Sequence, residues 1–237
     1  MNLRGVAIIA LLALAAPYVA AEEEESPWAG KAKLGYLATS GNTNNSNLNG
    51  GFAISYSTDN WKHAFEAVAI HSAEDNATTA EAYEAGWKSE RSLSENNFLF
   101  GQLDWRKNRF SGYATQFSQT VGYGRRLIDS EIHKLNVEIG VGARQSELID
   151  GTEESETIIR GGLDYKWQLS ETAAFTQGIT IESGQENTYT ESVTALSAQL
   201  VGNLALVASY TVKNNSDVLP LIEKTDTYTA LSLEYIF

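Results

Sequence analysis

The sequence predicts an all-β protein, a transmembrane antiparallel up-and-down β-barrel of about twelve strands. Three observations predict this fold. From residue 28 onward, apolar and polar residues alternate with a period of two, which is the pattern of strands with one apolar face. Polar segments interrupt the alternation, and longer ones take turns with shorter ones. Residues 227–237, TYTALSLEYIF, form a final amphipathic strand that ends on an aromatic residue.

Residues 1–21 have the layout of a secretory signal peptide. Arg4 precedes the apolar core VAIIALLALAA, and Val19 and Ala21 occupy the small-residue positions before the expected cleavage site. This core is too short for a membrane-spanning helix. Residues 22–27 are expected to be a solvated acidic tail, so the predicted barrel comprises residues 28–237.

Composition restricts the possible functions. The chain has no cysteine, which excludes a disulfide scaffold and a cysteine-based zinc site. Its formal net charge of −13 argues against nucleic acid as a partner. No segment has the composition of a linker, so one domain is expected.

Four strands are expected in the first third of the chain, and the sequence assigns an apolar face to three of them. These faces are formed by Trp28, Ala32, Leu34, Tyr36 and Ala38, by Leu48, Phe52, Ile54 and Tyr56, and by Tyr83, Ala85 and Trp87. Between the second and the fourth, residues 61–71 read as a strand whose facing the sequence does not assign. A polar loop is predicted at 72–79.

The middle third contains the clearest alternation. The expected apolar faces are Leu99, Leu103 and Trp105; Phe117, Val121, Tyr123 and Leu127; Leu135, Val137, Ile139, Val141 and Ala143; and Ile159, Leu163, Tyr165 and Trp167. An acidic loop is predicted at 145–155, between the last two of these strands.

The last third is expected to complete the barrel. Its apolar faces are Ala173, Phe175, Ile179 and Ile181; Leu196, Ala198 and Leu200 in a weaker strand; and Leu204, Leu206, Ala208, Tyr210 and Val212. The longest connection is predicted at 213–226, before the final strand.

The bacterial outer membrane is the environment that explains these apolar faces. Lipid offers no hydrogen-bond partners, so a sheet can cross it only as a closed barrel without free edges. Short turns on one side and longer loops on the other match the periplasmic and outer ends of such barrels. Eight aromatic residues fall near strand ends, where interfacial girdles belong: Trp28, Tyr36, Tyr56, Tyr83, Trp105, Tyr165, Trp167 and Tyr235.

The opposite faces of the strands supply the candidate lumen. The residues predicted to line it are Lys31, Lys33, Glu84, Lys88, Asp104, Arg106, Arg126, Lys134, Glu138, Arg144, Arg160, Asp164, Lys166 and Glu182. Nine of these are basic and six acidic if Glu90 is added. Two interpretations remain open: a network of internal ion pairs that fills the barrel, and a narrow polar pore with a mild preference for anions.

No catalytic, cofactor or metal site is predicted, and the chain is expected not to be an enzyme. The sequence contains no nucleophile elbow, phosphate loop or metal-ligand spacing. The alternative is a barrel phospholipase or protease, for which His71 near an outer loop is the best-placed histidine; the adjacent Ser72 points to the opposite face of the strand. The acidic outer loop at 147–156 could bind divalent cations that bridge lipopolysaccharide, although a solvated loop is the plainer interpretation.

Several phrases of the sequence resemble one family. They are SGNTNNSNLNGGF, the WKH at 61–63, the strand at 98–105, and the glycine-containing segments 121–127 and 139–145. Together they are similar to the YdiY-like family of salt-induced outer-membrane proteins, the domain-of-unknown-function family 481. The resemblance spans the chain after the signal peptide. It implies an outer-membrane barrel linked to salt response, and it carries no catalytic residues.

The function predicted from the sequence is therefore that of an integral outer-membrane barrel, either a narrow passive pore or a structural envelope protein associated with salt or osmotic response. An adhesion or structural barrel without transport is a further alternative. The expected partners are outer-membrane lipid, lipopolysaccharide, small ions or solutes, and the barrel-assembly machinery, through residues 227–237.

Overall fold

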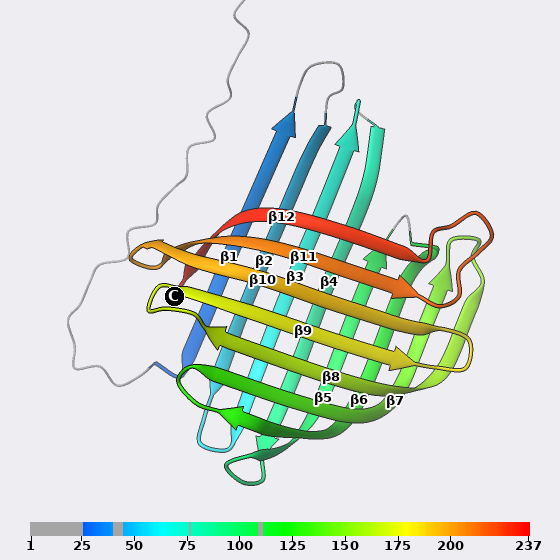
Figure 1. Ribbon diagram of the computed structural model, residues 1–237. Helices are drawn as coiled ribbons and strands as arrows, with labels where there is room; N and C mark the ends of the chain where they lie inside the picture. Colours follow the sequence, from blue (N-terminus) through cyan, green and yellow to red (C-terminus); the bar gives the residue numbers. More distant parts are fainter. Residues whose placement is uncertain (1–25, 40–44, 76, 109–110) are drawn as a thin grey trace, which may run out of the picture.

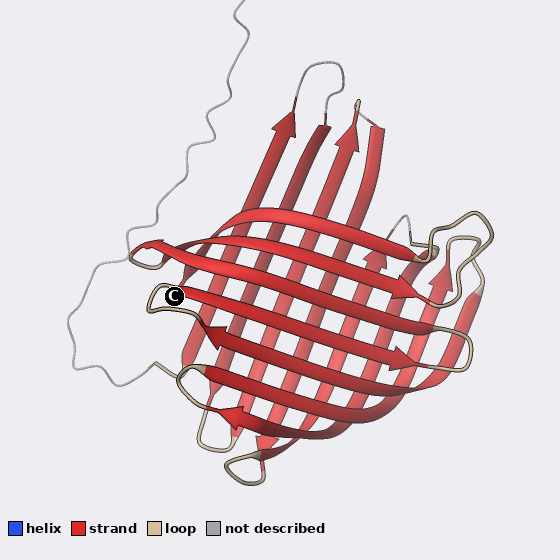
Figure 2. Cartoon of the chain, viewed as in Figure 1, coloured by secondary structure: helices blue, strands red, loops and turns tan. Residues whose placement is uncertain are grey.

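The protein is a closed antiparallel barrel of twelve strands, as the sequence predicts (Figures 1 and 2). The computed structural model describes residues 26–39, 45–75, 77–108 and 111–237, so the predicted signal peptide and most of the acidic tail lie outside the described residues. The strands are β1 (Trp28–Thr39), β2 (Asn45–Ser57), β3 (Trp61–Glu74), β4 (Ala77–Ser92), β5 (Asn97–Asn108), β6 (Tyr113–Asp129), β7 (His133–Leu148), β8 (Glu153–Gln168), β9 (Ala173–Ser183), β10 (Thr188–Val201), β11 (Leu204–Asn215) and β12 (Thr225–Ile236). Among the described residues, no helix has the length and hydropathy to span a membrane.

Each strand pairs with its neighbours in the sequence, and β1 pairs with β12 to close the barrel. The closing ladder is short, from Lys31 opposite Ile236 to Leu34 opposite Leu233. Two further backbone hydrogen bonds between Gly30 and Phe237, of 2.7 and 2.9 Å, extend it. Strands β9 to β12 in the near wall cross β1 to β4 in the far wall (Figure 1), as the strand tilt of a barrel requires.

The two faces of the sheet are sorted in the opposite way to a soluble protein. On β7, Ile139 and Val141 are 63% and 56% exposed on the outer face, whereas Glu138 and Arg144 are buried on the inner face. A continuous apolar exterior around charged, buried groups is stable only when lipid covers the exterior. The predicted facing of this strand is confirmed.

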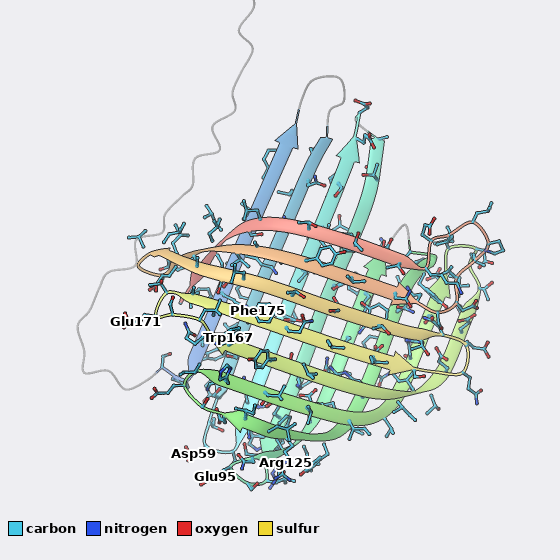
Figure 3. The ribbon with its side chains drawn as sticks, in the orientation of Figure 1. Asp59, Glu95, Arg125, Trp167, Glu171 and Phe175 are labelled. Atoms are coloured by element: carbon cyan, nitrogen blue, oxygen red, sulfur yellow. The ribbon has the colours of Figure 1, made fainter. Side chains whose placement is uncertain are left out.

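Aromatic side chains gather at the end of the barrel that carries the short turns. The rings of Trp28 and Tyr56 lie 4.7 Å apart, and His63 stacks between Trp61 and Trp87 on the outer face. On the wall opposite β1–β3, His133 lies against the rings of Tyr165 and Trp167. Figure 3 shows Trp167 and Phe175 near the turn that carries Glu171. These rings mark one interface of the membrane.

The structure settles the facing of β3. Trp61 and Phe65 are exposed on the outer face, while Glu66 and Val68 line cavities inside the barrel. The sequence left this open because small alanines occupy outward positions and the inward positions include apolar residues, Val68 and Ile70. The inward and outward faces of β3 therefore differ little in hydropathy.

Three predicted loops are wrong in extent because strands continue through them. Strand β3 runs to Glu74 and β4 begins at Ala77, so most of the predicted 72–79 loop is strand. The acidic segment 147–156 contains the beginning of β8, and the 213–226 connection shrinks to 216–224. Beyond the apolar belt, the outer faces of the strands meet water. Polar residues therefore occupy both faces of these strand ends, and the sequence pattern there resembles that of a loop.

The connection between β7 and β8, residues 149–152, lies at the outer end but is as short as the β8–β9 turn at residues 169–172, so the predicted alternation of longer and shorter connections fails here. Local hydrogen bonding shapes this turn. The backbone N–H of Thr152 donates to the Asp150 carboxylate at 2.9 Å, which lowers the pKa of Asp150. Gly151 follows with φ of +85°, a conformation that side chains with a Cβ disfavour.

The inside-out sorting predicts how single charges affect stability. Val141→Arg places a cation in the apolar belt and is expected to lower the free energy of unfolding by about 2–4 kcal/mol. Gln145→Arg, on the same face of β7 but nearer its outer end, is expected to cost no more than about 1 kcal/mol. Urea titration of the protein folded in lipid vesicles measures both, and equal costs would contradict a lipid-facing belt.

Candidate functional site

One part of the barrel interior is filled by bonded charges. The Arg106 guanidinium on β5 donates two hydrogen bonds of 2.9 Å to the Glu182 carboxylate on β9. Because β5 and β9 are not neighbours in the sheet, this pair crosses the interior. Arg144 on β7 lies 3.6 Å from the same carboxylate and forms a second ion pair, of 2.5 Å, with Glu156. Arg144 and Glu182 are both fully buried.

A second cluster joins β4 to β7 and β8. Lys88 forms ion pairs with Glu138 and with Glu90. Arg160 donates to the other oxygen of Glu138 at 2.8 Å. Strands β4 and β7 are not neighbours, so this cluster also spans the lumen. It lies nearer the short turns, because Glu90 and Lys88 are close to the end of β4.

Two phenylalanines are buried among these cations. Phe98 and Phe100 are 1% and 4% exposed and face inward from β5. Arg126 lies 4.9 Å from the centre of the Phe98 ring, and Lys88 lies 5.3 Å from that of Phe100, which suits cation–π attraction. The inward-facing glycines of β6 leave space for these two rings, because a Cβ at Gly124 would collide with the Phe98 ring. The sequence analysis did not predict either ring as an interior residue, although both lie on the same face of β5 as Gln102 and Asp104.

A third cluster includes a lysine that the sequence placed in a loop. Lys213 on β11 forms ion pairs with Glu84 on β4 and with Glu191 on β10. The buried hydroxyl of Tyr189 donates to Glu191 at 3.1 Å. The sequence analysis did not assign Lys213 to the lumen, because the polar residues that follow it in the sequence resemble a loop.

The connection 216–224 folds over the outer end of the barrel. It reaches the β5–β6 connection, where Gly112 lies close to the side chains of Val218 and Ile222. The buried side chain of Asn187 holds it from a third direction, because its carbonyl accepts from the backbone N–H of Asp217 at 3.2 Å. Figure 1 shows this connection beside the outer ends of β5 to β10. The outer mouth is therefore covered on that side.

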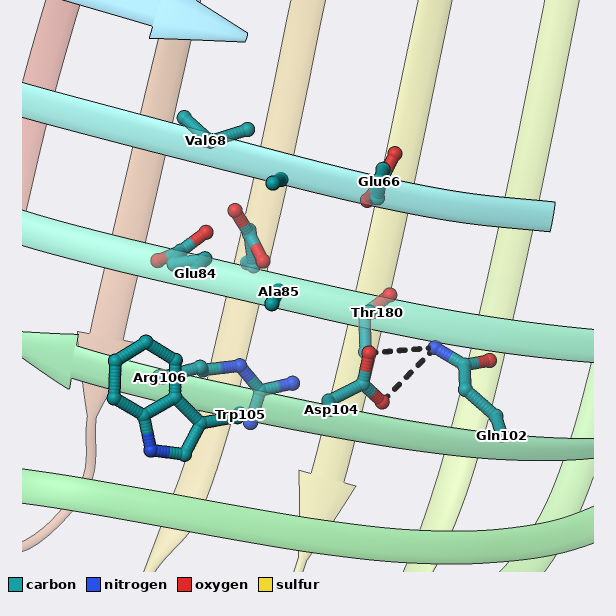
Figure 4. Close-up of a pocket in the computed structure, with 12 residues that line it drawn as sticks. Glu66, Val68, Glu84, Ala85, Gln102, Asp104, Trp105, Arg106 and Thr180 are labelled. Atoms are coloured by element: carbon teal, nitrogen blue, oxygen red, sulfur yellow. Dashed lines mark hydrogen bonds between the residues drawn. The ribbon is translucent and has the colours of Figure 1, made fainter. Parts of the chain in front are cut away.

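Between and beside these clusters, the interior contains a row of three cavities. The largest, about 630 Å³, lies toward the short turns and is lined by charged residues that include Lys31, Lys62 and Asp164. Glu66 and Asp104 also line a neighbouring cavity of about 90 Å³, which we call the neck (Figure 4). A third cavity, about 310 Å³, lies toward the outer end and is lined mainly by β2, β3 and β12.

The predicted lumen residues fall into three groups. Residues in the bonded clusters are Glu84, Lys88, Arg106, Arg126, Glu138, Arg144, Arg160 and Glu182. Residues around the cavities include Lys31, Asp104, Asp164 and Lys166. The stem of Lys33 lies over Gly51, and Lys134 pairs with Asp129 beside a short turn, at 3.3 Å.

The basic surplus counted from the sequence does not hold. Two more cations belong to the interior, Lys62 and Lys213. Five more carboxylates do as well: Glu66, Glu156, Glu191, Asp226 and Glu234. They were missed because Glu66 lies on the unassigned strand and most of the others were read as parts of loops or of the final strand. The interior therefore has no surplus of cations that would favour anions.

The three histidines lie on the outer face. His71 is exposed there and Ser72 faces the 310 Å³ cavity. His63 bonds to Ser89 at 2.7 Å and His133 to Tyr165 at 2.9 Å. Within the residues that the structure describes, no group of three or more histidine, aspartate or glutamate side chains is arranged to hold a metal ion.

Comparisons with known proteins agree with this architecture. Residues 32–237 match the model of the family described as "Protein of unknown function, DUF481". The chain is 32% identical over 212 residues to "Uncharacterized protein YdiY" of Escherichia coli (strain K12), covering 89% of this chain and 84% of that protein.

Solved structures show the same fold at low sequence identity. The NanC porin matches with a TM-score of 0.50 and 11% identity, covering 87% of this chain and 97% of the porin. The COG4313 outer membrane channel from Pseudomonas putida F1 matches with a TM-score of 0.50 and 10% identity, covering 92% and 99%. Together with the lipid-facing exterior, the fold places the chain in the bacterial outer membrane, as the sequence predicts.

The buried charges should behave as a unit. Glu182→Gln leaves Arg106 and Arg144 without their shared carboxylate and is expected to lower the free energy of unfolding by about 3–5 kcal/mol. Lys134→Met, which removes an exposed pair, is expected to change it by no more than about 1 kcal/mol. A small effect of Glu182→Gln in the same urea titration would show that the cluster contributes little.

Proposed function

Because the chain belongs to the DUF481 family and forms an outer-membrane barrel whose interior is partly open, we propose that it is a narrow passive pore for small ions or small polar solutes. The observation that carries this proposal is the row of three cavities in the lumen, the largest of which is lined by residues of β1–β5, β8–β10 and β12. The similar fold of the NanC porin and of an outer membrane channel supports it.

Unpaired charges support a hydrated interior. Within the described part of the chain, Lys62, Glu66, Asp164 and Lys166 have no hydrogen-bond or ion-pair partner, and all four line the 630 Å³ cavity. A charge without a protein partner is stable only in contact with water. We therefore expect water in this cavity, which a passive pore requires.

A structural envelope role is the second candidate. The bonded clusters and the covered outer mouth favour it, because the ion pairs tie strands together across the lumen and the 216–224 connection covers part of the outer entrance. The two functions differ in one observable, the passage of ions.

Several finer features belong to the same proposal. Residues 1–21 act as a cleaved signal peptide, and residues 227–237 are the segment that the barrel-assembly machinery recognises. Lipopolysaccharide surrounds the outer ends of the strands. The association with salt or osmotic response rests on the family resemblance. An enzymatic role has little support, since the three histidines face outward, away from the polar interior.

Conductance separates the two candidates. The protein reconstituted in a planar bilayer is expected to give small, stable single-channel currents. Val68→Trp fills the neck and should reduce the current at least about tenfold, because a side chain far larger than valine enters a cavity of only 90 Å³.

The neighbouring residue provides a matched control. Ala69 faces lipid from the same strand, so Ala69→Trp should leave the current unchanged. Absence of current in the folded wild-type protein would favour the structural barrel.

A further inference from the structure

The neck is surrounded by carboxylates from four strands. Glu66 on β3, Glu84 on β4, Asp104 on β5 and Glu191 on β10 all line its 90 Å³ cavity. Figure 4 shows Glu66 and Glu84 on adjacent strands, above Asp104 and Arg106. This is the smallest of the three cavities in the open part of the lumen.

Two cations at this level, Arg106 and Lys213, are already engaged, whereas Lys33 lies near Glu66 and Glu84 without an ion pair to a described residue. Arg106 donates both of its terminal nitrogens to Glu182, outside the neck. Lys213 is shared between Glu84 and Glu191. The carboxylates around the neck therefore outnumber the cations that could neutralise them.

Two of the carboxylates have no cationic partner. Asp104 accepts hydrogen bonds of 3.0 and 2.9 Å from the neutral amide of Gln102 (dashed lines in Figure 4), and no ion pair joins it to a described residue. Glu66 has neither a hydrogen bond nor an ion pair with any residue that the structure describes. Its charge faces water in the passage.

The wider cavity below the neck has no such bias. Five cations line it, Lys31, Lys62, Lys88, Arg160 and Lys166, against the carboxylates Glu66, Asp104, Asp164 and Glu234. A fixed charge acts most strongly on a permeating ion where the passage is narrow and little water screens it. Charge selection is therefore set at the neck rather than in the wide cavity.

We infer that the neck makes this pore selective for small cations over anions, and that Glu66 and Asp104, its two carboxylates without an ion pair, determine this selectivity. The inference rests on the proposed pore and gives it a substrate class, small hydrated cations. It reverses the anion preference drawn from the sequence. Glu66 is a better determinant than Glu84 or Glu191, because their charge is already balanced in part by Lys213.

The test is the reversal potential of the reconstituted protein under a KCl gradient. Wild type is expected to pass K⁺ more readily than Cl⁻. Glu66→Gln, which keeps the shape of the side chain, should lower the permeability ratio about sixteenfold, because one unit charge about 5 Å away in water changes the permeabilities of K⁺ and Cl⁻ about fourfold each, in opposite directions. Glu66→Lys should move the preference toward Cl⁻.

Two further variants keep the result specific. Asp164→Asn removes an equally unpaired carboxylate from the wide cavity and should change the ratio less than about twofold, because water screens it there. Asp104→Asn, in the neck, should lower the ratio as Glu66→Gln does. Heat-modifiable migration on gels checks that each variant is folded.

The outcomes separate the selectivity from the pore. Current with a Cl⁻ preference in wild type, or a ratio that Glu66→Gln leaves unchanged, overturns the inference while the pore stands. No current in the folded wild-type protein overturns both.

Discussion

The constraint on which the structure depends is that lipid cannot hydrogen-bond to the protein backbone. A sheet can cross the membrane only if the donors and acceptors of every strand are paired, and the ladder between β1 and β12 provides the last of these pairings. This closing ladder is short, so the two backbone hydrogen bonds between Gly30 and Phe237 carry part of the closure. The facing of each side chain then follows from the pleat, with Ile139 and Val141 toward lipid and Glu138 and Arg144 inside.

Closure of the barrel also brings charged side chains together in its interior. Charged groups of many strands point into one narrow space, and buried charges are stable only when they are paired and hydrogen-bonded. On the β5–β9 side the solution is direct ion pairing, in which Glu182 serves both Arg106 and Arg144. Around the 630 Å³ cavity, Lys62, Glu66, Asp164 and Lys166 have no such partner among the described residues, and we propose that water solvates them.

The sequence predicted the fold because period-two alternation is a local signal that survives without tertiary information. Leu135, Val137, Ile139 and Val141 show it clearly, and β3 fails to show it because Val68 and Ile70 face inward. The pairing inside the lumen could not be predicted in this way. Which cation meets Glu182 depends on barrel shear, which brings β5 and β9 together across the interior. Lys213 and Glu156 were read as loop residues because strands outside the membrane lose their apolar face.

The central claim is that the exterior meets lipid while the 630 Å³ cavity inside the barrel holds water. The chain has no cysteine, so single cysteines report on this directly. In the protein reconstituted in lipid vesicles, a charged water-soluble thiol reagent should label cysteine at positions 62 and 164 and leave cysteine at positions 139 and 141 unreacted. Rapid labelling at 139 and 141, with positions 62 and 164 inert, would contradict it.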